Sequence, residues 1–477
     1  MENEKHPDEA PPLCVDLDGS LVKIDTLHQT LFLLLRRKPA SILRIPGWLL
    51  KGKAHLKDQV MRRVELDASA LPYNSKLLTW LRKEHAAGRK LVLATASNYR
   101  TANAVSEHLG LFEEILASNE TTNLRHGAKL AAIKERFPSF GYVGNDKADF
   151  PIWDAADQIV LANPSTAAKK GYAVKAGHIF VEQRPALGMI VKAMRCQQWL
   201  KNILLFTPML LAHRFGDPGA WIQSAIAFFA FGFAASSIYI LNDLFDLSAD
   251  QHHPRKCKRP FAAGDLSIAT GSLMIPLLVA ASLFLGMLLP LAFLLVLIAY
   301  FVLTTLYSWW LKQVAIADVL MLALLYSMRI VAGSVATATA ASGWFIEFSI
   351  FLFLSLALVK RTSELREMAQ GAEENHAQRE RGYRIADLPL LTGFGAASGY
   401  IAVFVFTMYL NSEKVSELYS RPQFLWAFCP LLLYWITRIW HLAWCGEVDD
   451  DPLAFAARDF QTYLVGALGA AALLYAI

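Results

Sequence analysis

The chain has 477 residues, of which 55% are hydrophobic, and a formal net charge of +5. Up to about residue 190 the sequence is typical of a soluble α/β protein, and beyond it long apolar runs alternate with short polar loops. This asymmetry argues against a single soluble domain and predicts a soluble domain followed by a membrane domain. The modest net charge indicates the cytoplasmic loops of a membrane protein rather than a nucleic-acid-binding surface. The five scattered cysteines lack the spacing of disulfides or metal ligands.

The sequence predicts four segments. Residues 1–12 are a polar, disordered N-terminus without the features of a cleavable signal peptide, so we expect the first half of the chain to stay in the cytoplasm. Residues 13–182 form a soluble α/β domain with a Rossmann-type parallel sheet and a helical cap at about 25–85. Residues 183–194 are a linker, and 195–477 are an all-α polytopic membrane domain.

Three short apolar strands in the first half each lead into polar residues. They are LCVDLDGSLV at 13–22, KLVLATAS at 90–97 and FGYVGNDKADFPIW at 140–153. Helical stretches such as 99–109 and 126–136 alternate with them, which predicts a parallel sheet. Because parallel sheets bind ligands at the carboxyl ends of their strands, we expect the polar residues to form a site there.

This set of motifs resembles the haloacid dehalogenase (HAD) superfamily of phosphatases. The resemblance implies that Asp16 is the nucleophile that takes the phosphoryl group and that Asp18 is the acid/base. It further implies that Thr95 and Lys129 bind the phosphoryl oxygens, and that a Mg²⁺ site includes Asp16 and Asp149 with Asp146 or Asn145. Ser20 and Asn145 depart from the residues that are usual in this superfamily. An inactive or regulatory HAD-like domain is the alternative.

Within the predicted cap, RKPASILRIPGWLLKGKAHLK at 37–57 is both basic and apolar. Such a segment either rests on a membrane surface or packs inside the cap.

Nine apolar stretches in the second half are long enough to cross a membrane. Positive charges gather in the second, fourth and sixth loops between them, which contain 255–259, Lys312 and 360–384. The positive-inside rule then places these loops and the N-terminal domain in the cytoplasm of a bacterium, with the C-terminus across the inner membrane. The predicted spans are 197–213, 219–241, 268–288, 291–309, 314–337, 344–360, 390–410, 423–444 and 459–477.

The second predicted span leads into NDLFDLSADQHHPRKCKRP at 242–260. On a helix, Asn242, Asp246 and Asp250 lie on one face with Asp243 beside them, and such like charges repel unless cations sit among them. Carboxylates at membrane depth indicate function, and oxygen ligands suit Mg²⁺ that is bridged to substrate phosphates. The basic residues that follow can bind phosphate oxygens; they include His253, Lys256 and Arg259.

This segment resembles the first aspartate-rich motif, NDxxDxxxD, of the UbiA superfamily of intramembrane prenyltransferases. Its extension resembles DRxHPxKxxRP of the decaprenyl-phosphate phosphoribosyltransferase subgroup, with Gln251 in place of Arg. RCQQWLKNILLF at 195–206 resembles RPxQWxKN of the same subgroup through Arg195, Lys201 and Asn202. YSWWLKQVAIAD at 307–318 resembles a second signature region through Tyr307, Lys312 and Asp318. EVDDDPLAFAARD at 447–459 is either a lid that supplies a further ligand or a solvated loop.

The resemblance implies a Mg²⁺-dependent transfer of phosphoribose from phosphoribosyl pyrophosphate to a polyprenyl phosphate, in cell-envelope synthesis. Asp243, Asp246 and Asp250 would hold Mg²⁺, and Arg195, Lys201, Lys256 and Arg259 would bind phosphates. The fused phosphatase would remove the 5-phosphate. The alternatives are transfer of a polyprenyl group to an aromatic acceptor and a non-enzymatic lipid-phosphate carrier. A homo-oligomer remains open.

Overall fold

The computed structural model describes residues 10–182, 186–370, 382–448 and 452–477. The chain divides into two compact units, and each contains two stretches of sequence. The first unit is Met1–Arg195 with Tyr239–Pro276, and the second is Cys196–Ile238 with Leu277–Ile477. Most of the predicted disordered N-terminus, the start of the predicted linker and part of the acidic 447–459 loop lie outside the described residues.

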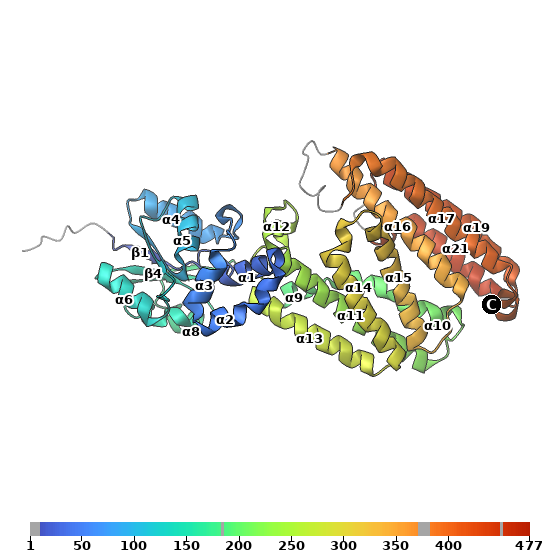
Figure 1. Ribbon diagram of the computed structural model, residues 1–477, viewed down its shortest axis with the longest axis horizontal. Coiled ribbons are helices and arrows are strands. Elements are labelled where there is room, and N and C mark those ends of the chain that lie inside the picture. Colours follow the sequence, from blue (N-terminus) through green and yellow to red (C-terminus); the bar gives the residue numbers. More distant parts are fainter. Residues whose placement is uncertain (1–9, 183–185, 371–381, 449–451) are drawn as a thin grey trace, which may run out of the picture. The chain divides into compact units, whose positions relative to one another are not determined.

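A six-stranded, all-parallel sheet forms the centre of the first unit, which confirms the predicted α/β fold (Figure 1). The strand order is β3-β2-β1-β4-β5-β6. The chain thus runs outward from β1 to one edge and then returns to β4 on the other side of β1, so the order reverses between β1 and β4. The strands are β1 (Leu13–Val15), β2 (Leu91–Asn98), β3 (Glu114–Ser118), β4 (Gly141–Gly144), β5 (Gln158–Ala162) and β6 (His178–Phe180).

Local signals place the helices of this unit. Asp25 caps α1 by accepting the amides of Leu27 and His28, Asn98 caps α5 through the amide of Arg100, and Gly110 ends α5 in the left-handed conformation that glycine favours. The predicted helices 99–109 and 126–136 are confirmed as α5 and α6. The helices are α1 (Thr26–Arg37), α2 (Ile45–Leu50), α3 (Lys53–Met61), α4 (Ser75–Ala86), α5 (Tyr99–Leu109), α6 (Gly127–Arg136), α7 (Phe150–Trp153), α8 (Thr166–Tyr172), α9 (Ala186–Met194) and α12 (Leu247–His252).

Helices α1 to α3 share a small apolar core of their own, built on Leu33, Leu34, Leu56 and Val60. In α4, the Trp80 ring lies 4.9 Å from the ring of His178 and 5.4 Å from that of Phe180, the ends of β6. The first three helices therefore share a core of their own, yet α3 also reaches the sheet, because Lys57 Nζ donates to the carbonyl of Ala96 on β2. The boundary of the cap at residue 85 stays a prediction.

Within the described residues, six helices are long and apolar enough to cross a membrane, so the chain is a multi-pass membrane protein. They correspond to six of the nine predicted spans. Residues 361–370, predicted as loop, continue the fifth of these helices. The six are α11 (Pro218–Phe245), α13 (Ile268–Met287), α14 (Leu291–Trp309), α15 (Ala317–Ala336), α16 (Gly343–Gln370) and α17 (Leu388–Leu410).

The other three predicted spans have different forms. Residues 197–213 form a 3₁₀ segment, η4 (Cys196–Phe206), and the short α10 (Thr207–Leu211) instead of one helix. Residues 423–444 form η9 (Pro422–Ala427) and α19 (Phe428–Cys445), and 459–477 form α21 (Phe460–Ala476). These three crossings stay predictions. Two shorter helices, α18 (Glu413–Leu418) and α20 (Pro452–Ala456), complete the unit.

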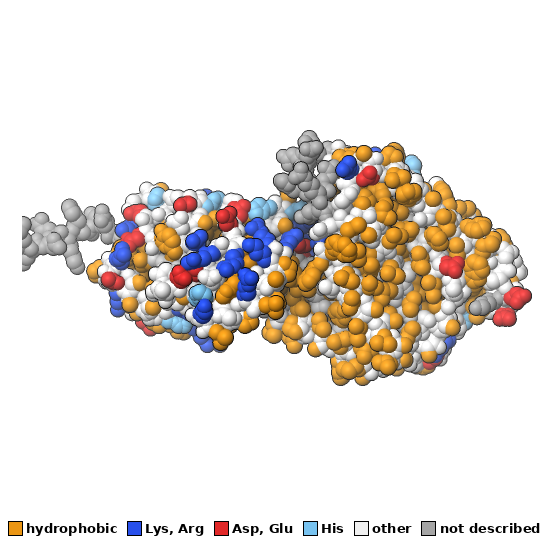
Figure 2. All heavy atoms as spheres, viewed as in Figure 1, with side chains coloured by type: hydrophobic (Ala, Val, Ile, Leu, Met, Phe, Trp, Pro, Cys, Tyr) orange, Lys and Arg blue, Asp and Glu red, His pale blue; other side chains and the backbone are white. Residues whose placement is uncertain are grey.

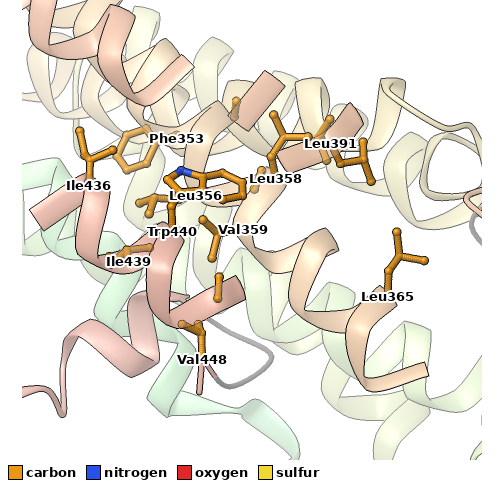
Figure 3. Close-up of a cluster of buried hydrophobic side chains, with 14 of the residues drawn as sticks. Phe353, Leu356, Leu358, Val359, Leu365, Leu391, Ile436, Ile439, Trp440 and Val448 are labelled. Atoms are coloured by element: carbon orange, nitrogen blue, oxygen red, sulfur yellow. The ribbon is translucent and has the colours of Figure 1, made fainter. Parts of the chain in front are cut away.

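The second unit has two main apolar cores. One joins α15, α16, α17 and α19, and Figure 3 shows the Trp440 ring among the aliphatic side chains of α16. Gly395 permits this packing, because a Cβ there would lie 2.1 Å from the Trp440 ring, whose Nε1 donates to Ser355 Oγ at 3.0 Å. The other core joins η4, α11, α14 and α15 around Phe231 and Phe293.

Candidate functional site

The reversal point of the sheet holds a buried set of charged groups. Lys129 Nζ, on α6, lies 2.8 Å from Asp16 Oδ1 and 3.9 Å from Asp149 Oδ1. Tyr142, on β4, accepts from Lys129 at 2.9 Å and donates to Asp149 Oδ1 at 2.8 Å. All four side chains are buried. The structure therefore brings together the side chains of Asp16, Lys129 and Asp149.

Asp18 faces the beginning of the helical cluster. Its Oδ1 accepts the backbone amide of Thr26 at 2.9 Å, and its Oδ2 accepts the hydroxyl of Ser97. Thr95 is fully buried at the end of β2, where its hydroxyl accepts the amide of Ser97 at 3.0 Å. The end of β2 and the start of α1 thus hold Asp18 in place, two residues beyond Asp16.

Burial dominates the electrostatics of this set. It raises the pKa of Asp16 to about 7, although Lys129 opposes the shift. Burial also raises the pKa of Asp18, with the charge of Asp25 adding to it. Burial alone would lower the pKa of Lys129, but the charges of Asp16 and Asp149 outweigh it and raise that pKa. A further cation at this position would favour the ionised form of Asp16.

The predicted metal ligands after β4 take different positions. Asp149 Oδ2 accepts the amides of Asn145 at 2.9 Å and Asp146 at 3.1 Å, and Tyr142 occupies Oδ1. Asp146 is exposed, and its side chain caps the short turn that follows. The side chain of Asn145 lies against Gly19 (φ +77°) in the loop after β1, where a Cβ on this glycine would be 2.2 Å from Asn145 Nδ2. Of the two candidate partners for Asp149, Asn145 therefore lies nearer the Asp16 loop.

A second set of charged residues follows α11 and belongs to the same unit. The helix ends at Phe245 and α12 begins at Leu247, yet the helical ladder continues: the amide of Asp246 donates to the carbonyl of Asn242, and that of Asp250 to the carbonyl of Asp246, both at 2.8 Å. The predicted stacking of these residues along one side is thus consistent with the backbone. Asp243 and Asp250 are each only 3% exposed.

Arginines compensate these carboxylates. Arg259 Nη1 lies 3.1 Å from Asp243 Oδ1 and 2.6 Å from Asp250 Oδ2. Arg195 Nη2 lies 2.5 Å from the same oxygen of Asp243, and Arg36 Nη1, from α1, lies 2.8 Å from Asp246 Oδ1. Burial raises the pKa of Asp250, and Arg259 opposes the shift. This is the cation arrangement that the run of like charges requires.

The donor set fits a divalent cation at two of the three aspartates. One nitrogen of Arg259 touches both Asp243 and Asp250, so a single cation reaches both carboxylates. Mg²⁺ commonly uses one or two carboxylates and takes its other ligands from water and phosphate. Across the described stretches, no three acidic, histidine or cysteine side chains are grouped as a metal site would need. Asp246 is paired with Arg36.

The basic part of the segment is half-exposed. His253 Nδ1 accepts the amides of Arg255 at 3.2 Å and Lys256 at 3.3 Å, so this ring shapes the turn that carries the cations. Burial, with the charge of Lys256, lowers the pKa of His253. A neutral ring with this nitrogen as acceptor suits that position.

The remaining predicted residues belong to the second unit. Asp318 is fully buried at the start of α15, where Arg361 Nε lies 2.5 Å from its Oδ2 and Tyr383 donates to its Oδ1. Arg361 also pairs with Glu364 and donates to Tyr307 at 3.3 Å. Asp318 and Tyr307 therefore share a buried network whose other members the sequence analysis missed. The signal was present as KRTSE at 360–364, charges within an apolar helix. Lys312 is half-buried in the turn η6 (Leu311–Gln313).

Asn202 joins η4 to neighbouring helices. It is 1% exposed, its Oδ1 accepts Arg329 Nε at 3.0 Å, and its Nδ2 donates to the carbonyl of Phe228 at 3.3 Å. Lys201, next to it, places its ammonium 5.5 Å from the centre of the Tyr326 ring. Asn202 therefore links η4 to α11 and α15, and Lys201 also lies against α15, over the ring of Tyr326.

Comparison with known proteins gives a consistent family. The profile of the UbiA prenyltransferase family matches residues 203–465. An uncharacterized protein, y4nM, of Sinorhizobium fredii is 36% identical over 98% of this chain and 92% of its own length. The nodulation protein NoeC of Azorhizobium caulinodans is 33% identical over 59% of this chain and 90% of its own length. A decaprenyl-phosphate phosphoribosyltransferase of Mycolicibacterium smegmatis is 33% identical over 40% of this chain, which spans 64% of that relative.

Among solved structures, a UbiA homolog from Archaeoglobus fulgidus bound to GPP and Mg²⁺ aligns with 60% of this chain and 98% of its own. The two are 15% identical, with a TM-score of 0.46. The profile match covers more than half of the chain, and the first relative covers nearly all of it. With its apolar helices, the chain therefore belongs to the UbiA prenyltransferase family of membrane enzymes.

Proposed function

We propose that this chain transfers phosphoribose from phosphoribosyl pyrophosphate to a polyprenyl phosphate. The observation that carries the proposal is the pairing of Asp243 and Asp250 with Arg195 and Arg259, which combines carboxylates for a divalent cation with cations for phosphates. Two phosphorylated substrates call for more cations than an aromatic acceptor would. The 33% identity with a relative named decaprenyl-phosphate phosphoribosyltransferase supports the same choice.

The reaction breaks the bond between ribose C1 and the pyrophosphate oxygen, which keeps the electron pair. A phosphate oxygen of the lipid then forms the new bond to C1, and pyrophosphate leaves. Asp243 and Asp250 would hold Mg²⁺, which when bound supplies charge neutralisation of the pyrophosphate. Arg195, Lys256 and Arg259 would bind phosphate oxygens where charge develops, and they would hold the two substrates in position.

The α/β domain would then act as a HAD-type phosphatase on the 5-phosphate of the product. The carboxylate of Asp16 would attack phosphorus, and Asp18 would protonate the departing ribose oxygen. Water activated by Asp18 would next release inorganic phosphate from Asp16. Thr95 and Lys129 would bind the phosphoryl oxygens, and Asp16 with the Asn145 and Asp149 loop would bind Mg²⁺. The contact of Lys129 with Asp16 supports this assignment.

The test is a membrane assay with Mg²⁺, ribose-labelled phosphoribosyl pyrophosphate and a polyprenyl phosphate. We expect label in the lipid phase with the wild type, a loss of at least a hundredfold with Asp243→Asn or Asp250→Asn, on the order of what one electrostatic contact contributes, and no loss with Glu417→Gln, an exposed carboxylate on α18. Asp16→Asn should still label the lipid but should accumulate its 5-phosphorylated form.

Other outcomes would redirect the assignment. Label transfer that persists in Asp243→Asn and Asp250→Asn would remove the proposed centre. No transfer from phosphoribosyl pyrophosphate, but transfer of a labelled prenyl group to an aromatic acceptor, would establish the alternative enzyme. Movement of polyprenyl phosphate across the membrane without any chemistry would establish a carrier.

A further inference from the structure

The segment 36–53 of the first unit, from the end of α1 to the start of α3, carries six cations and no acidic residue. We call it the interfacial segment. Its basic residues are Arg36, Arg37, Lys38, Arg44, Lys51 and Lys53.

Two side chains of α2 attach this helix to the domain. Ile45 and Trp48, one turn apart on α2, pack against the small core of α1 and α3, and Arg63 stacks over the Trp48 ring at 4.7 Å. Neither is fully buried, and no residue of α2 is. The helix is therefore held by one side only.

Four large apolar side chains on the remaining surface of the segment are exposed. Leu43 is 82% exposed and Leu50 is 89% exposed, while Ile42 and Leu49 are 59% and 48% exposed. Such a group of exposed aliphatic residues is unusual on a soluble domain and marks a surface that binds something apolar. In Figure 2, Lys and Arg side chains gather over the region where Figure 1 draws α1 and α3.

The interfacial segment begins beside the end of α11, a candidate membrane span. Arg36, in the last turn of α1, donates to the carbonyl of Phe245 at 3.2 Å as well as pairing with Asp246. The Phe32 ring meets the Phe245 ring at 5.6 Å. Because Phe245 is the last residue of α11, a helix long and apolar enough to cross a membrane, the interfacial segment starts beside the end of a candidate span.

We propose that the interfacial segment lies on the membrane surface, with Leu43 and Leu50 inserted among acyl chains and its cations on anionic lipid headgroups. Apolar residues flanked by Lys and Arg are the composition that binds such a surface, since both forces act in the same direction. The segment thereby holds the phosphatase-like domain against the bilayer in which a lipid substrate would reside. This inference does not depend on the proposed reaction.

The test uses the full chain in nanodiscs. Cys196, Cys257, Cys429 and Cys445 are replaced by serine, which leaves the buried Cys14. A fluorophore is then attached to Leu50→Cys or, as a control, to Val174→Cys, which is fully exposed on the same unit. Lipids with a quencher on the acyl chain should quench the probe at residue 50 several-fold more than that at 174. The quenching should weaken in purely zwitterionic lipid and in the Arg44→Glu, Lys51→Glu, Lys53→Glu variant.

Equal and weak quenching at both positions would overturn the proposal. Protection of the residue 50 probe only in discs that hold two copies would assign this surface to a second chain instead. Quenching that is equal in anionic and zwitterionic lipid would overturn the part assigned to charge.

Discussion

At the scale of single residues, the sequence shows which charged residues are unusual, but it does not show which of them contact one another. Asp16 follows β1 and Lys129 lies on α6, and the two side chains meet at 2.8 Å. Asp318, in contrast, was expected to face substrate and is enclosed by Arg361 and Tyr383. Sequence shows that Asp318 and Arg361 are unusual for membrane helices, but their separation of 43 positions hides the contact.

Breaking the Asp318 pair should destabilise the second unit. Arg361→Gln leaves a fully buried carboxylate without its cation, and we expect a loss of about 3–5 kcal/mol. Thermal unfolding in detergent measures it. The matched control is Arg438→Gln, whose partner Asp459 is less buried, and its loss should be smaller. The double variant Arg361→Met, Asp318→Leu should recover much of the stability, since it removes both charges. A loss in the double variant as large as in Arg361→Gln would contradict the pairing.

At the scale of elements, length and apolarity predicted six spans with ends close to those observed. The predicted end of the span at residue 360 was wrong, because Arg361 and Glu364 pair with each other inside α16 and their charges do not mark a loop. The 197–213 stretch was expected to be one helix and is largely 3₁₀. Composition could not predict this 3₁₀ form, because contacts of individual side chains hold the segment in place. Trp199 donates to Ser236 at 3.0 Å, and Asn202 accepts from Arg329.

Glycine sets the approach of η4 to α15. A Cβ at Gly333 would lie 2.1 Å from the carbonyl oxygen of Leu205, and backbone cannot move aside as a flexible side chain does. Gly333→Ala should therefore lower the free energy of unfolding by about 1–3 kcal/mol, measured by thermal unfolding in detergent. Gly466→Ala on α21 is the matched control: no atom lies within 4 Å of its added Cβ, so its effect should be neutral or slightly stabilising. Equal effects of the two changes would refute this account.

At the scale of the whole molecule, the predicted division into a soluble domain before residue 183 and a membrane domain after residue 195 differs from the compact units. Residues Tyr239–Pro276 group with the α/β part. Contacts within that unit explain it: Arg36 pairs with Asp246, Asp67 with His252, and Gln29 donates to Gln251 at 2.7 Å. Such long-range contacts cannot be read from local patterns, which show only where each element begins and ends.

The Asp67–His252 pair gives this unit a dependence on pH. The carbonyl of Ser248 and Asp67, each 2.7 Å from a ring nitrogen, raise the pKa of His252 above 6.5. Hydrogen bonds from Ser69 and His252 hold the pKa of Asp67 at about 2. The raised pKa of His252 stabilises the folded unit fully below pH 6.5, and this stabilisation is lost as the pH rises through the raised pKa. The lowered pKa of Asp67 stabilises the folded unit above pH 3.8, and this stabilisation is lost only as the pH falls from 3.8 toward 2.

His252→Gln should therefore lower the unfolding temperature more at pH 5.5 than at pH 8.5. The effect should stay well below ~1 kcal/mol, because both side chains are about half exposed and solvent screens the pair. His85→Gln, an exposed histidine on α4, is the control at both pH values. If the difference in unfolding temperature between the wild type and His252→Gln were larger at pH 8.5 than at pH 5.5, the prediction would be wrong.

The grouping of Tyr239–Pro276 with the α/β domain also sets an order of events during synthesis. The ribosome must add the 81 residues from Cys196 to Pro276 before the first unit is complete, which takes roughly 4–16 s at about 5–20 residues per second. The sheet can form in that interval, but the partners of Arg36 and Asp67 have not yet been made. The nascent α/β domain would therefore emerge before Asp246 can pair with Arg36 and before His252 can pair with Asp67.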